Sequence, residues 1–270
     1  MSKHARIRSR LTRRGRRLVY TAAAGAVFVV AGGWVVAAHG DGTRQLSAQV
    51  DGRAGALPHG DGAGDDARSA RSAHRPRQLP DISEATRARI PKDSRQVVLV
   101  TGEAADSSYA KVTLYTREPG SPDWDAGDSW HARNGAKGWS EDRSYGGLQS
   151  PVGVFSLTDA GGLLPEPPGT RLPYDHQDAF VAGGRGVEGE SLEGSFDYVI
   201  AIDYNRVAGT SPLDPTKPEG EAKGGNIWLH VDHDGPSQGC VGLPAAGMMK
   251  LLETLDPAQH PVVVMGPKGH

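Results

Sequence analysis

Residues 225–244, GNIWLHVDHDGPSQGCVGLP, contain an apolar run, a turn-rich segment and the only cysteine of the chain, Cys240. The run at 226–231 has the length and the β-branched and aromatic content of a buried strand. Gly239 precedes the cysteine and has no side chain to hinder the approach of another molecule to the backbone. This stretch therefore predicts a strand followed by a turn that presents a cysteine.

Other strand-like runs lie on both sides of this stretch. Residues 97–101 (VVLVT) have the pattern of a buried strand, and residues 111–115 (KVTLY) alternate and should pair with them. Further strands are expected at 154–157, 196–204 and 260–265, and helices only at 83–90 and 244–255. Irregular structure is expected at 116–147, 161–178 and 206–225, which are rich in turn-forming residues. The sequence thus predicts one mainly β domain with a few short helices over residues 81–270.

The first 38 residues predict export from the cytoplasm. Residues 1–17 carry eight Lys or Arg and no acid, and residues 18–38 are 21 residues without a charge. A helix of roughly 20 such residues crosses a bilayer, and the positive-inside rule keeps the basic tail in the cytoplasm. A signal peptide cleaved after Val36-Ala37-Ala38 is the alternative, and Arg13-Arg14 also fits a twin-arginine signal. Each interpretation places the rest of the chain outside the cytoplasm.

Residues 39–80 predict a disordered linker. They are rich in Gly, Ala, Asp, Arg and Ser and show no apolar periodicity. Charge also divides the chain, because residues 1–80 hold 14 Lys and Arg against 5 acids, whereas residues 81–270 hold 16 against 27. A net acidic domain argues against nucleic acid as a partner, since phosphate binding needs a basic face.

Cys240 is the predicted nucleophile. An exported chain with a single cysteine has no partner for an internal disulfide, so a used thiol is favoured over a buried, inert one. The amides of Gly239 and Cys240 are candidates to hold a developing oxyanion. The helix expected at 244–255 would place its N-terminal end near the thiol and favour the thiolate.

His230 is the predicted base for this thiol. Strand alternation points His230 away from Leu229 and Val231, and therefore away from the aliphatic layer. The same alternation separates His230 from His233. A zinc site at His230, His233 and Cys240 remains an alternative if the strand ends before the second histidine.

The residues His230, SQGCV at 237–241 and SPVGVF at 150–155 together resemble the L,D-transpeptidase catalytic-domain family of bacterial cell-wall enzymes, in its actinobacterial form. The resemblance covers roughly residues 95–266 and implies an L,D-transpeptidase-like β-sandwich. It implies Cys240 as nucleophile and His230 as base, and it requires no metal or organic cofactor. The oxyanion and substrate-binding residues that we predict are Gly239, Ser237, Gln238 and Tyr174.

The implied reaction joins two peptidoglycan stem peptides. Cys240 would take an acyl group from a donor stem with release of D-alanine, and an acceptor stem would receive it in a 3→3 cross-link. The membrane, through residues 18–38, is the other predicted partner. Two positions depart from the family, because Gln238 and Gly242 stand where a histidine and an arginine are often found. An L,D-carboxypeptidase, another cell-wall thiol or zinc peptidase and a non-catalytic wall-binding module are the alternatives.

Overall fold

The structure, a computed structural model, describes residues 76–270. The predicted basic tail, the predicted anchor at 18–38 and the predicted linker up to residue 75 lie outside this range. Residues 76–270 include no helix that is both long enough and apolar enough to cross a bilayer.

The end of the predicted linker belongs to the folded domain. Leu79 is 1% exposed and packs in a core cluster with Val97 and Trp124. The Trp124 amide donates to the Arg77 carbonyl at 3.0 Å. These contacts join residues 77–79, the end of the predicted linker, to the domain predicted to begin at residue 81.

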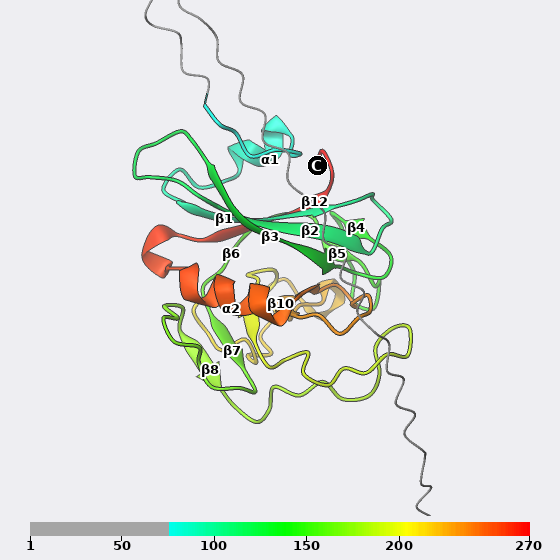
Figure 1. The fold of residues 1–270 in the computed structure, drawn as a ribbon. Coiled ribbons are helices and arrows are strands. Elements are labelled where there is room, and N and C mark those ends of the chain that lie inside the picture. The colour runs from blue at the N-terminus through cyan, green and yellow to red at the C-terminus, as the bar shows by residue number, and fades with distance from the viewer. Residues whose placement is uncertain (1–75) are drawn as a thin grey trace, which may run out of the picture. The chain divides into compact units, whose positions relative to one another are not determined.

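Ten strands form one curled sheet, in the order β6-β12-β1-β2-β3-β11-β10-β9-β7-β8 (Figure 1). Their bounds are β1 (Gln96–Gly102), β2 (Tyr109–Thr116), β3 (Asp125–Arg133), β6 (Gly153–Ser156), β7 (Ala160–Gly162), β8 (Tyr174–His176), β9 (Val199–Ala201), β10 (Trp228–Val231), β11 (Val241–Leu243) and β12 (Val262–Pro267). Strands β4 (Trp139–Ser140) and β5 (Ser150–Pro151) pair separately. The helices described are α1 (Glu84–Ala88), α2 (Ala245–Thr254) and the short 3₁₀ turns η1 (Glu221–Lys223) and η2 (Pro257–Gln259). The prediction of a mainly β domain with few helices is confirmed.

The predicted pairing of the first two strands is also confirmed. Strand β1 runs antiparallel to β2, with Val98 opposite Leu114, and parallel to β12 on its other side. Strand β3, which pairs with β2, lies in a segment predicted to be irregular. Its sequence DAGDSWHAR is mostly polar and exposed, so no apolar alternation marked it, and its strand form comes from pairing with β2.

Helix α2 packs in the core between the two halves of the sheet. Met248, Leu251 and Leu252 on one face are fully buried, in a cluster that includes Val100 of β1 and Leu229 of β10. Figure 1 shows α2, in orange, between the β1–β2–β3 half of the sheet and the β7–β8 half. Because α2 follows directly after β11, this packing also determines where the cysteine turn before β11 lies.

The strand predicted at 196–204 is shorter in the structure, where β9 covers only Val199–Ala201. The residues before it form turns, with the Asp197 amide bonded to the Gly194 carbonyl at 3.1 Å. This frees Phe196 from the sheet. Its ring packs edge-on against Trp228 at 5.0 Å and against His230 at 5.8 Å between ring centroids.

Candidate active site

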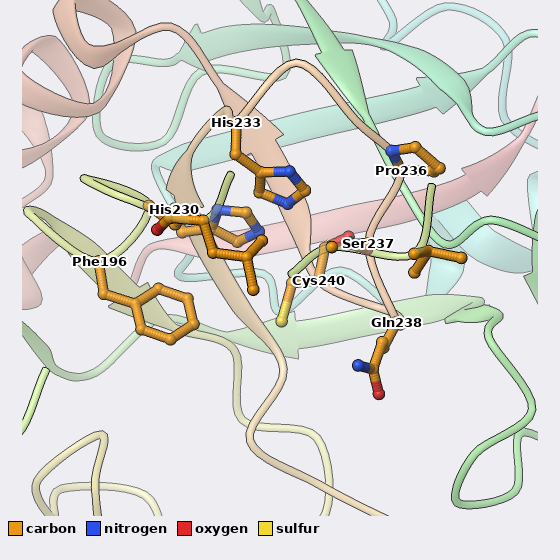
Figure 2. A pocket seen from close by; sticks show the side chains of 11 residues that line it. Phe196, His230, His233, Pro236, Ser237, Gln238 and Cys240 are labelled. Carbon is orange, nitrogen blue, oxygen red and sulfur yellow. Dashed lines mark hydrogen bonds between the residues drawn. The ribbon is translucent and has the colours of Figure 1, made fainter. Parts of the chain in front are cut away.

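A cavity of about 150 Å³ joins the cysteine turn to the end of β10. Cys240, His230, Ser237 and Gln238, all predicted from the sequence, line it together. Figure 2 shows their side chains around this space, with Phe196 and His233 beside them. Phe196 was not predicted as a site residue, because the turns around it left no regular pattern to identify it, and His233 was considered only as a ligand of the alternative zinc site.

Two parallel strands place His230 next to the cysteine turn. Strands β10 and β11 pair with His230 opposite Gly242, so the residue before β11, Cys240, lies level with Trp228. The side chain of His230 is 3% exposed, and its Nδ1 lies 2.8 Å from the Val231 carbonyl oxygen. Since a carbonyl only accepts, this bond assigns the proton of the neutral ring to Nδ1 and leaves Nε2 as an acceptor.

Burial controls the acidity of His230. Desolvation lowers the pKa of the imidazole from 6.5 to about 4, outweighing the Val231 carbonyl, which raises it, while His233 lowers it further. At neutral pH the ring is therefore uncharged and able to accept a proton. The predicted role of a base requires this neutral state.

Acid is expected to destabilise the protein through His230. The folded pKa of about 4 lies below the ordinary 6.5, so the unfolded chain binds the extra proton between these values and stability falls as the pH is lowered. The loss is complete below the folded pKa and amounts to about 3 kcal/mol. Urea unfolding of the wild type near neutral pH and at about pH 4 should show this loss of unfolding free energy. The His230→Gln variant should not show it. The same pH dependence in both proteins would contradict this assignment.

His233 lies closer to His230 than strand alternation predicted. Strand β10 ends at Val231, so the alternation stops there, and the two rings stack with 5.5 Å between centroids and 2° between planes. His233 also contacts Glu190, with its Nδ1 3.2 Å from Oε1 of that carboxylate. Within residues 76–270 no three His, Cys, Asp or Glu side chains are placed to hold a metal ion.

The surroundings of Cys240 raise the pKa of its thiol, whereas the sequence predicted surroundings that favour the thiolate. Burial raises its pKa, although the Trp228 amide, 3.4 Å from Sγ, and Arg143 both lower it. The predicted contribution of helix α2 is wrong, because the three residues of β11 separate the thiol from the helix by roughly 10 Å. The field of a helix end fades within about one turn, so α2 cannot stabilise a thiolate there.

Ser237 closes the turn that carries the cysteine. Its Oγ donates to the Cys240 carbonyl at 2.6 Å and accepts from the Gly239 amide at 3.0 Å. The Gly239 amide, predicted for an oxyanion hole, is therefore already used within the turn. The Cys240 amide donates no hydrogen bond within the part of the chain that the structure describes, so it is the donor available to an oxyanion.

The SPVGVF segment at 150–155 is hydrogen-bonded to the turn that carries Cys240. Ser150 is completely buried, and its Oγ donates to the Gly239 carbonyl at 2.8 Å while accepting from the Gly135 amide at 2.9 Å. This contact crosses 89 positions of sequence. It explains why these two motifs occur together, although the role of Ser150 itself was not predicted.

The absence of a side chain at Gly242 leaves room for the ring of His230. A Cβ at Gly242 would lie 3.1 Å from Oδ1 of Asp232 and 3.3 Å from Cε1 of His230, which is tighter than ordinary packing. A larger residue here would have to displace the predicted base. The glycine at this position is therefore explained by packing.

Tyr174 is not part of this cavity. Its hydroxyl donates to the Leu164 carbonyl at 2.9 Å, and burial raises its pKa. The residue lines a separate cavity with Asp159 and Asp175. The structure thus does not bring Tyr174 to Cys240, and the residue begins strand β8 within the segment 161–178 that was predicted to be irregular.

The assembled site offers a thiol, a neutral imidazole and a free amide around one cavity, which are the groups that acyl transfer through a thioester uses. Comparisons with protein-family models, with curated proteins and with solved structures find no match to this chain.

Proposed function

We propose that this protein is a peptidoglycan L,D-transpeptidase, with an L,D-transpeptidase-like β-sandwich as its catalytic domain and residues 18–38 as its membrane anchor. The observation that supports this best is the cavity in which Cys240 meets the neutral, carbonyl-bonded His230. The bond between the SPVGVF segment and the cysteine turn adds support, since both belong to the motif combination of that family.

In the first half-reaction, Cys240 attacks the carbonyl between the third and fourth residues of a donor tetrapeptide. The resting thiol points toward the Asn226 carbonyl, with Sγ 3.6 Å from that oxygen, and must turn to pass its proton to Nε2 of His230. The Cys240 amide stabilises the oxyanion that forms. The bond to the leaving D-alanine then breaks, and His230 returns the proton to the departing amine.

In the second half-reaction, the side-chain amine of a diamino acid on an acceptor stem attacks the thioester. His230 removes a proton from the attacking nitrogen, and Cys240 leaves as a thiolate that takes this proton back. The product is a 3→3 cross-link and the enzyme returns to its starting state. If water replaces the amine, the same steps make the protein an L,D-carboxypeptidase.

Gln238 is the proposed contact for the peptide backbone of the donor. Its side chain is exposed and lines the cavity, and its amide can both donate and accept hydrogen bonds. A histidine at this position would add a third titratable ring to the two of His230 and His233. Glutamine provides the hydrogen bonds without a change of charge.

Incubation of the full chain in detergent with purified tetrapeptide muropeptides tests the proposal. We expect cross-linked dimers that have lost one D-alanine per cross-link, measured by mass spectrometry, and none with Cys240→Ala. Released D-alanine without dimers would identify a carboxypeptidase. Binding to peptidoglycan with neither product would identify a wall-binding module, and equal products from both proteins would exclude Cys240 as the nucleophile.

A further inference from the structure

Arg143 lies buried behind the cysteine turn and was not predicted as a site residue. Its side chain donates to three backbone carbonyls from three segments, at 2.7 Å to Gln149, 3.2 Å to Lys223 and 3.2 Å to Gln238. The residue is 6% exposed. One guanidinium thus connects the turn before Cys240 to the loop before β10 and to the segment before β5.

The charge of Arg143 has no acidic partner. No carboxylate within residues 76–270 forms an ion pair with it, and the Tyr204 ring, with its centroid 6.0 Å from Cζ, is the one aromatic contact of its charge in that range, although burying an unpaired guanidinium costs several kcal/mol. Hydrogen bonds to the three carbonyls offset part of that cost. A neutral side chain could make some of these bonds, so holding the loops together does not by itself account for the positive charge.

The guanidinium lies directly against the backbone that precedes the nucleophile. A Cβ built on Gly239 would be 2.9 Å from Nε of Arg143 and 3.0 Å from Nη2. Gly239 also has a φ of 144°, a conformation that residues with side chains rarely adopt. Both the missing side chain and the backbone conformation let the positive charge approach the backbone next to Cys240.

We infer that Arg143 is the positioning residue that holds the Gly239–Cys240 turn and stabilises the thiolate that forms when Cys240 loses its proton. The inference rests on the proposed function in taking Cys240 as the nucleophile. Arg143 supplies the positive charge that was expected from the end of helix α2. The other titratable groups at the thiol are His230 and His233, with Glu190 beyond His233.

The acidity of the thiol can be measured without any substrate. Cys240 is the only cysteine, so the rate of iodoacetamide alkylation of the full chain reports this one group as a function of pH. We expect Arg143→Gln to raise the midpoint of this profile by about one pH unit, which means about tenfold slower alkylation below both midpoints. Arg143→Lys keeps the charge and should leave the midpoint within roughly half a unit of the wild type.

Arg117 provides the matched control, because it also donates to three backbone carbonyls, those of Pro91, Lys92 and Ser94, and lies over the ring of Trp124. Arg117→Gln should lower the melting temperature and leave the alkylation midpoint unchanged. An unchanged midpoint in Arg143→Gln would overturn the inference. If Arg143→Gln does not fold, a rise of about one pH unit in the alkylation midpoint of Arg143→Lys would overturn the inference instead. The result does not depend on whether muropeptides are cross-linked, so the inference and the proposed function can fail separately.

Discussion

Full-length protein treated with a penem is expected to gain the mass of one drug molecule, and Cys240→Ala is expected to gain none. Attack by Sγ opens the strained four-membered ring, and the carbonyl carbon becomes a thioester of Cys240. No part of the drug leaves on ring opening, so the whole mass stays on the protein. The Cys240 amide, which has no other hydrogen-bond partner within residues 76–270, stabilises the oxyanion of this reaction as it would that of the substrate. Intact-mass spectrometry measures the adduct directly.

Unfolded wild-type protein is the control for the cavity in this experiment. It keeps the only thiol of the chain but loses His230 and the free amide beside it. We expect acylation to be much slower in urea than in the folded state. Equal adduct on the wild type and on Cys240→Ala, or equal rates with and without urea, would contradict the assignment of Cys240 as an activated nucleophile.

Replacing His230 with glutamine should lower kcat/KM for D-alanine release by about 10²- to 10⁴-fold, the usual contribution of a general base. The effect should be this large because the thiol is protonated at rest, since burial raises its pKa, and needs an acceptor for its proton. Glutamine has a similar volume and can still donate to the Val231 carbonyl, but it cannot take up a proton. Steady-state release of D-alanine from tetrapeptides measures the loss.

His260→Gln is the matched control for that variant. His260 is exposed, ends the 3₁₀ turn η2 and lies 3.6 Å from Asp93, outside the cavity of Cys240. Its replacement should leave kcat/KM within about twofold. Should His230→Gln retain similar activity while its fold is intact by thermal melting, His230 would not be the base, and His233 would be the next candidate.

Much of the fold could be predicted from local patterns. Residues 97–101 and 111–115 predicted β1 and β2 and their pairing, because branched apolar residues in short runs have few other stable arrangements. The apolar stripe at 244–255 predicted α2, and Pro244, predicted as its first residue, stands one position earlier, at the N-cap. The meeting of His230 with Cys240 was also predicted, since a strand and a short turn connect them.

The same local reasoning was wrong where distant segments decide the conformation. Strand β3 has a polar sequence and becomes a strand only by pairing with β2. Strand β10 ends at Val231, as the apolar run at 226–231 indicated, but the path of the turn that stacks His233 on His230 could not be predicted from that run.

The sequence by itself determined the mainly β class and indicated that Cys240 and His230 lie near each other, because both depend on periodicity and on neighbours within about ten positions. Only the tertiary structure decided the electrostatics of the thiol. Helix α2 is close to Cys240 in sequence but separated from it by β11, whereas Arg143, almost a hundred positions away, lies against the cysteine turn. Charge acts through space, so the order of residues along the chain could not show which positive group lies near the cysteine turn.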